Sequence, residues 1–283
     1  MPNAGHEQFI GCDSTYQRAD AAVFGAPFDG TASYRPGARF GPGAIRAESY
    51  GIETYSPYQN RDLGDIRVFD GGDLELPFGN AAAALELIDE RAGEYLRDGK
   101  RPVMLGGEHL VTLGALRAAS RAHPDLRVVH FDAHCDMREQ YMGERLSHAT
   151  VMRRAHELVG DGRIYQFGIR SGERRELEFA AEHAVTRMYD LRGVGETVRS
   201  FGGLPVYVTV DLDVLDPSCL PGTGTPEPGG ATFRELLAAV LELAGANIVG
   251  ADITELSPHY DTSGISAAAA CVTLRELLLI IHK

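Results

Sequence analysis

The sequence has few cysteines and no spacing that would pair them. Its four cysteines, Cys12, Cys135, Cys219 and Cys271, are scattered along the chain and form no C-x-x-C motif. Disulfide-stapled domains are dense in cysteine, and thiolate zinc sites use closely spaced pairs. The sequence therefore indicates neither kind of site, and it fits a protein of the reducing cytoplasm.

Long hydrophobic runs are also missing. The longest apolar run near the carboxyl end is "LLLII", far short of the roughly 20 residues that span a bilayer. The first 17 residues, "MPNAGHEQFIGCDSTYQ", lack a basic segment followed by an apolar one, which a secretion signal would show. We therefore expect a soluble, cytoplasmic protein that is not exported.

Basic side chains are scarce compared with acidic ones. The chain has 27 Lys and Arg against 40 Asp and Glu, which gives a formal net charge of −13. This charge opposes binding to nucleic acid or to an anionic membrane. It favours a small cationic ligand, although an acidic composition by itself also serves solubility.

Short apolar segments alternate with helical ones along the whole chain. The β candidates are residues 21–27, 66–72, 102–108, 128–134, 164–170, 184–190, 206–213 and 248–255. The clearest helix covers residues 80–99, with Asn80 as N-cap, Gly99 as the stop, and Leu85, Ile88, Ala92 and Tyr95 on one face. The alternation predicts an α/β fold, with a mostly parallel sheet of about eight strands between helices. We expect a single domain over residues 1–283.

Acidic residues and histidines follow four of the predicted strands. In "VVHFDAHCDM" the side chains of Asp132, His134 and Asp136 are two residues apart, so an extended segment points them to one face. The other strand ends carry His109, Asp211, Asp213 and Glu255. Active sites of parallel sheets lie beyond the carboxyl ends of the strands. These side chains are therefore expected to meet at one edge of the sheet.

Six of these residues suit a pair of metal ions: His109, Asp132, His134, Asp136, Asp211 and Asp213. Carboxylates crowded together need a positive partner, and a carboxylate-rich set favours Mn²⁺ or Mg²⁺. Two ions that share carboxylates can lower the pKa of a water towards ~7. Each motif alone has a simpler interpretation, as a solvated loop, a capped turn or the start of a helix. Their coincidence at three strand ends favours the metal centre.

In several motifs the chain resembles the ureohydrolase family of arginases and agmatinases, and the stretch "YGIETYSPYQNRDL" and the "LSH" at His148 look like those of bacterial agmatinases. The similar segments are "GGEHLVTLG", "HFDAHCDMR", "VTVDLDVLDPSCLPGTGTPEPGG", "ADITELSP" and, upstream, "GAPFDGTASYRPGARFGPGAIR". The resemblance implies a three-layer α/β/α sandwich of the arginase/deacetylase type, and hydrolysis of a guanidinium by two Mn²⁺ ions. It also implies two ligand sets: His109, Asp132, Asp136 and Asp211 for one ion, and Asp132, His134, Asp211 and Asp213 for the other.

The resemblance also implies three catalytic roles and a substrate. Asp136 would orient the attacking hydroxide, Glu255 would pair with the guanidinium, and His148 would pass a proton to the leaving amine. Agmatine, hydrolysed to urea and putrescine for polyamine biosynthesis, is the expected substrate. The alternatives are a related guanidino or formimino compound such as 4-guanidinobutyrate, L-arginine, and a catalytically silent regulator. The family usually forms trimers or hexamers.

Two residues depart from the arginase pattern. Arg138 lies where arginases carry an asparagine that recognises the α-carboxylate and α-amine of the substrate. Because the far end of agmatine is an ammonium, the Arg138 side chain should point away from it or pair with Glu139 or Glu144. Cys135 replaces a threonine between two ligands. Strand alternation turns it away from the metals, and we expect it to be buried.

Overall fold

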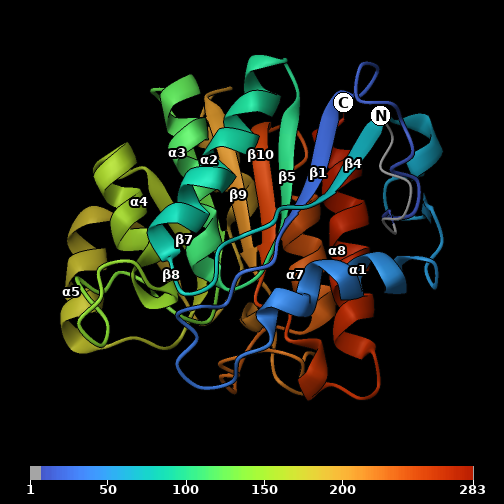
Figure 1. The fold of residues 1–283 in the computed structure, drawn as a ribbon. Coiled ribbons are helices and arrows are strands. Elements are labelled where there is room, and N and C mark those ends of the chain that lie inside the picture. Colours follow the sequence, from blue (N-terminus) through green and yellow to red (C-terminus); the bar gives the residue numbers. More distant parts are fainter. Residues whose placement is uncertain (1–7, 283) are drawn as a thin grey trace.

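The computed structural model describes residues 8–282, which form a parallel sheet between two layers of helices (Figure 1). Residues 1–7, part of the stretch in which no secretion signal is expected, lie outside the described residues. The strands are β1 (Ala21–Ala26), β4 (Val68–Asp73), β5 (Arg101–Gly106), β6 (Arg127–Phe131), β7 (Ile164–Ile169), β8 (Val185–Met188), β9 (Pro205–Asp211) and β10 (Asn247–Thr254). They lie in the order β4-β1-β5-β10-β9-β6-β7-β8, and each pairs in parallel with its neighbours. The predicted fold class and every predicted strand segment are confirmed.

The helices divide between the two faces of this sheet. One layer contains α2 (Ala81–Arg97), α3 (Thr112–Ala122), α4 (Val151–Val159) and α5 (Arg174–His183), and the other contains α1 (Gly41–Ser49), α6 (Val194–Ser200), α7 (Phe233–Leu241) and α8 (Ile265–Ile281). A short hairpin of β2 (Tyr55–Ser56) and β3 (Arg61–Asp62) lies outside the main sheet. None of the helices within residues 8–282 is both long enough and apolar enough to cross a membrane.

Strand alternation builds a separate hydrophobic core on each face. In β1, Ala22 and Phe24 belong to the core beneath α2 and α3, whereas Ala21 and Val23 belong to the core beneath α7 and α8. Successive side chains of a strand point to opposite faces, so a strand covered on both sides must be apolar at nearly every position. This requirement explains the continuous apolar segments in the sequence.

Helix α2 forms where the sequence pattern places it. The side-chain oxygen of Asn80 accepts a hydrogen bond of 3.0 Å from the backbone N–H of Ala83, which is the expected N-cap. Leu85, Ile88, Ala92 and Tyr95 are all buried. Gly99 takes a left-handed conformation, with φ of 72°, just after the helix.

The strand order opens a crevice at the centre of the sheet. Strands β5 and β6 follow one another in the chain, yet β10 and β9 lie between them. The chain connections on the two sides of this central pair of strands therefore run in opposite directions, which makes it a topological switch point. Ligands of parallel sheets bind beyond the carboxyl ends of the strands at such a point. Short helices η3 (His109–Val111) and η5 (Leu212–Val214) begin there, after β5 and β9, and η4 (His148–Thr150) leads into α4.

Candidate active site

A cavity of about 190 Å³ lies beyond the carboxyl ends of the four central strands. Its lining includes seven of the predicted site residues: His109, His134, Asp136, His148, Asp211, Asp213 and Glu255. The eighth, Asp132, is fully buried beside them, and its Oδ2 lies 3.0 Å from Nδ1 of His109. The structure thus brings together every residue that the motifs indicated.

The first group of side chains surrounds one nitrogen of His109. Its Nδ1 lies 3.0 Å from Oδ2 of Asp132, 3.1 Å from Oδ2 of Asp136 and 3.3 Å from Oδ2 of Asp211. The four side chains are at most a few per cent exposed. Three carboxylates and one imidazole therefore face a common point that water hardly reaches.

The second group adjoins the first through Asp132. Nδ1 of His134 lies 2.9 Å from Oδ2 of Asp213 and 3.6 Å from Oδ1 of Asp132. Asp132 therefore turns one oxygen to His109 and the other to His134. This is the arrangement that a carboxylate bridging two ions requires.

Repulsion among these carboxylates marks a place for positive charge. Burial and then the charge of Asp132 raise the pKa of Asp136 to about 7. Burial, followed by Asp213 and Asp132, raises the pKa of Asp211 well above its usual range. Carboxylates at this density stay ionised only beside cations. An oxygen-rich set with two imidazoles fits divalent metal ions, and Mn²⁺ or Mg²⁺ among them.

The turns at the strand ends use some of the same oxygens. Oδ1 of Asp132 accepts a hydrogen bond of 2.6 Å from the N–H of His134, and Oδ1 of Asp211 accepts one of 2.9 Å from the N–H of Asp213. Asp211 is thus a capping aspartate, as the simpler interpretation of its motif has it, while its Oδ2 faces His109. The capping interpretation of the D-x-D motif is confirmed for Oδ1 of Asp211, and its Oδ2 stays available to a metal ion.

A buried chain of hydrogen bonds sets the orientation of His109. The ring donates from Nε2 to Oγ1 of Thr209 over 3.0 Å, because that hydroxyl gives its own proton to Oδ1 of Asp252 over 2.6 Å. Nδ1 therefore presents a lone pair to the three carboxylates, and only a cation between them can satisfy it. Burial would lower the pKa of His109, but hydrogen bonds to Asp132 and Asp136 raise it well above its usual range. Without a metal ion, a proton on Nδ1 therefore supplies the positive charge. The sequence analysis missed Thr209 and Asp252. Thr209 lies two residues before Asp211, on the same face of β9.

His130 was missed as well. Its Nε2 lies 2.7 Å from Oδ2 of Asp132, and its Nδ1 lies 3.1 Å from Nε2 of Gln166. The amide of Gln166 donates, so Nε2 of His130 carries the proton and donates it to Asp132. Burial lowers the pKa of His130, which keeps the ring neutral. The signal was present in the sequence, since His130 precedes Asp132 by two residues on one strand.

Glu255 lies in the cavity without a cationic partner among residues 8–282. Its Oε1 accepts a hydrogen bond of 2.8 Å from the N–H of His109. The guanidinium of Arg170 does not pair with it and donates to the backbone carbonyls of Asp213 and Glu227, both over 2.8 Å. Burial, followed by the charges of Glu108 and Asp213, raises the pKa of Glu255 well above its usual range. A cation bound beside it would relieve that cost.

His148 closes one side of the cavity at the start of η4. Its N–H donates to Oγ1 of Thr31 over 3.1 Å, and that hydroxyl donates to the buried carboxylate of Glu108 over 2.6 Å. Burial and then the charge of His134 lower the pKa of His148 to about 4. The imidazole is therefore neutral at pH 7 and able to accept a proton.

Comparison with known proteins covers nearly the whole chain. The arginase family model matches residues 19–280. The chain belongs to this family. It is 48% identical to an agmatinase of Bacillus subtilis, over 96% of this chain and 95% of the relative, and 39% identical to proclavaminate amidinohydrolase of Streptomyces clavuligerus, over 92% and 87%. The crystal structure of agmatine ureohydrolase of Thermoplasma volcanium matches with a TM-score of 0.89 and 34% identity, over 97% of this chain and 94% of that one.

Membership of the arginase family confirms the resemblance seen in the motifs, including the likeness to bacterial agmatinases. The expectation of an enzyme of the amidinohydrolase class is confirmed with it.

Arg138 has a different partner from the two expected. It lines the cavity, and its Nε lies 3.4 Å from Oε2 of Glu176 in α5, so the expected pairing with Glu139 or Glu144 is wrong. Glu139 pairs with Arg153 over 3.1 Å on the surface instead. Glu176 is only 4% exposed, and the N–H of Met137 donates to it over 2.9 Å, which holds it beside Arg138.

Cys135 is fully buried, as expected, with its Sγ 3.8 Å from Oε1 of Gln166. Gln166 is the residue that orients His130. The thiol therefore packs behind the site and does not face it.

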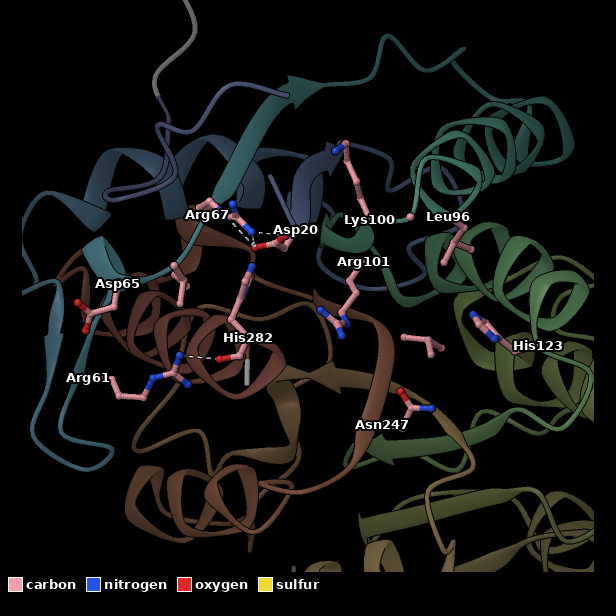
Figure 2. A pocket seen from close by; sticks show the side chains of 13 residues that line it. Asp20, Arg61, Asp65, Arg67, Leu96, Lys100, Arg101, His123, Asn247 and His282 are labelled. Carbon is pink, nitrogen blue, oxygen red and sulfur yellow. Dashed lines mark hydrogen bonds and ion pairs between the residues drawn. The ribbon is translucent and has the colours of Figure 1, made fainter. Parts of the chain in front are cut away.

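A larger cavity, of about 770 Å³, lies at the opposite edge of the sheet, near the amino ends of β5 and β10 (Figure 2). Three of its four Lys and Arg side chains already have partners: Arg67 pairs with Asp20 over 2.9 Å, Arg61 donates to the carbonyl of His282 over 2.6 Å, and Lys100 donates to that of Ala19 over 2.9 Å. No group of catalytic side chains converges there among the described residues. We therefore place the active site in the smaller cavity.

Proposed function

We propose that this protein hydrolyses the guanidinium of agmatine to urea and putrescine at a centre of two Mn²⁺ ions. The observation that carries the proposal is the pair of imidazole–carboxylate groups joined by Asp132. Beside it lies Glu255, a buried carboxylate whose charge no side chain balances within residues 8–282. The named agmatinase among the relatives supports the choice of substrate.

The metal ligands of the proposal follow the two groups. His109, Asp132, Asp136 and Asp211 would hold one ion, and Asp132, His134, Asp211 and Asp213 the other. Two such ions, when bound, supply a water of lowered pKa as the nucleophile. A set of four carboxylates and two imidazoles favours manganese over softer metals.

The chain's own residues then position and protonate the reactants. The carboxylate of Glu255 would accept hydrogen bonds from the planar, permanently charged guanidinium. Asp136 would orient the attacking water. Neutral His148 would accept a proton and pass it to the leaving amine, since its ring lines the same cavity.

The pairing of Arg138 with Glu176 supports a cationic substrate tail. An unpaired arginine in the cavity would attract the carboxylate of 4-guanidinobutyrate and repel the ammonium of agmatine. Glu176 offsets that charge, and the ring of Tyr141 lies 4.7 Å from the guanidinium carbon of Arg138. The net charge of −13 further favours a cationic substrate over an anionic one.

Urea release from a substrate panel tests the proposal. The chelated protein is reloaded with Mn²⁺, Mg²⁺ or Zn²⁺ and given agmatine, L-arginine, 4-guanidinobutyrate or guanidinopropionate. We expect the highest kcat/KM for agmatine with Mn²⁺. A preference for 4-guanidinobutyrate would overturn the substrate, and absence of urea in every combination would identify a catalytically silent regulator.

We further propose that the protein acts in the cytoplasm as a homo-oligomer, a trimer or a hexamer. The family resemblance supports the oligomer, and the burial of Cys12, Cys135 and Cys271 as free thiols supports a reducing compartment. Light scattering of the purified protein would measure the oligomer, and a monomeric mass would refute it.

A further inference from the structure

Two histidines and an aspartate meet on the surface, in the helical layer of α4 and α5. Oδ1 of Asp161 lies 2.7 Å from Nε2 of His156 and 2.7 Å from Nδ1 of His183. His156 lies in the last turn of α4, Asp161 in the loop that follows, and His183 at the end of α5. One ligand atom of each lies within 4.8 Å of the other two. We infer that these three side chains form a separate binding site for a zinc-class divalent cation.

The two imidazoles are held in place before any ion binds. The ring of Phe179 packs against both, with centroid distances of 5.1 Å to His156 and 4.1 Å to His183, while the two imidazole centroids are 5.0 Å apart. The N–H of Gly162 donates to the carbonyl of His183 over 2.8 Å, which ties the loop of Asp161 to the end of α5. A site whose ligands are already oriented loses less conformational entropy on binding.

The electrostatics of the cluster favour a cation. Carbonyl groups at the carboxyl end of a helix carry partial negative charge, and His156 and His183 lie in the last turns of two helices. Hydrogen bonds from His156 and His183 lower the pKa of Asp161, so its carboxylate is ionised at neutral pH. These features attract any cation, so the selectivity among metals depends on the ligand atoms.

The ligand atoms select zinc over manganese. Two imidazole nitrogens and one carboxylate oxygen suit Zn²⁺ and other late transition metals, whereas Mn²⁺ prefers oxygen-rich sites. Zinc binds such ligands at about 2.0–2.2 Å in a tetrahedron whose fourth position water can fill. The Asp161 side chain is 73% exposed, so it can move to widen the cluster around the ion. None of the three residues belongs to the buried centre, which manganese would occupy.

Zinc content of matched variants tests this inference. The protein loaded with Mn²⁺ is dialysed against a series of Zn²⁺ concentrations, and bound zinc and manganese are measured per chain by elemental analysis. We expect Asp161→Asn, His156→Gln and His183→Gln each to bind one equivalent of zinc fewer than the wild type. The control His123→Gln removes a histidine outside the cluster and should match the wild type. Equal zinc in all five proteins would overturn the inference.

Thermal melting separates lost binding from lost folding. Asp161→Asn keeps the size of an exposed side chain, and its melting temperature without zinc sets the baseline for its own response to zinc. Added zinc should raise the melting temperature of the manganese-loaded wild type and of His123→Gln, and raise that of Asp161→Asn less. An identical rise in all three would refute the site. Urea release with Mn²⁺ should be unchanged in Asp161→Asn, so the result stands apart from the proposed function.

Discussion

Replacing Glu255 by Gln removes one negative charge from the cavity and changes little else. The substitution keeps the side-chain length and one acceptor oxygen for the N–H of His109, which now donates over 2.8 Å. It also leaves the left-handed backbone at this position, with φ of 64°, in place. The perturbation is therefore confined to the proposed contact with the guanidinium.

The size of the effect follows from the kind of hydrogen bond that is lost. Hydrogen bonds to charged groups contribute about 1.5–3 kcal/mol, and about 1.36 kcal/mol corresponds to a tenfold change in rate. We expect kcat/KM for agmatine to fall about 10- to 150-fold, with metal content unchanged. The melting temperature should hold or rise, because a buried carboxylate with a raised pKa is costly in the folded state.

Glu276→Gln is the matched control for this experiment. Glu276 is also buried, but its Oε1 accepts hydrogen bonds of 2.9 and 2.7 Å from Arg275. The Glu276→Gln substitution should lower the melting temperature, because it leaves the buried Arg275 without its counter-charge. It should leave kcat/KM unchanged. If Glu255→Gln behaves in the same way, with a large drop in melting temperature and normal kinetics, Glu255 is a structural residue and our reasoning is wrong.

Three further predictions concern the metal ligands, the proton shuttle and the stability of the fold. Asp211→Asn should cost more manganese and more activity than Asp213→Asn, because Asp211 serves both proposed ions; equal losses in elemental analysis and urea assays would count against the bridging role. His148→Ala should lower kcat with manganese retained, and added imidazole should restore part of it; loss of manganese would make His148 a ligand. Burial alone would raise the pKa of Asp261, but hydrogen bonds from Ser263 and Ser266 lower it to about 2. A depressed pKa stabilises the fold above the ordinary value near 4, and this stability is lost as the pH falls through about 2. Asp261→Asn should therefore lower the free energy of unfolding by about 1–2 kcal/mol at pH 7 in urea titrations, and a difference that persists unchanged at pH 2 would exclude this carboxylate as its source.

The residues of the buried centre could be read from the sequence because local geometry places them. Asp132, His134 and Asp136 follow one strand at intervals of two residues, and Asp211 and Asp213 follow another. Strand periodicity decides the face, and parallel pairing brings the carboxyl ends of different strands to one edge of the sheet. The same periodicity would have found His130, had the pattern been followed one step towards the amino end of the strand.

Contacts between elements that are distant in the sequence could not be predicted from sequence patterns. Arg138 has acidic neighbours at positions 139 and 144 in the sequence, yet it pairs with Glu176, which α5 places beside it. The link from His109 through Thr209 to Asp252 joins η3, which follows β5, to β9 and β10, and the sheet order decides that these elements are adjacent.

The sequence by itself determined the α/β class, the strand segments, the helix predicted over residues 80–99 and the residues that meet at the buried centre, because each depends on dihedral periodicity or on motifs within a few residues. Only the tertiary structure decided which oxygen of Asp132 faces His109, which acid neutralises Arg138, and that His156 and His183 share Asp161. These pairings depend on how strands order themselves in the sheet and how helices pack on its faces. That packing is settled by the burial of two whole hydrophobic cores, and no local pattern encodes it.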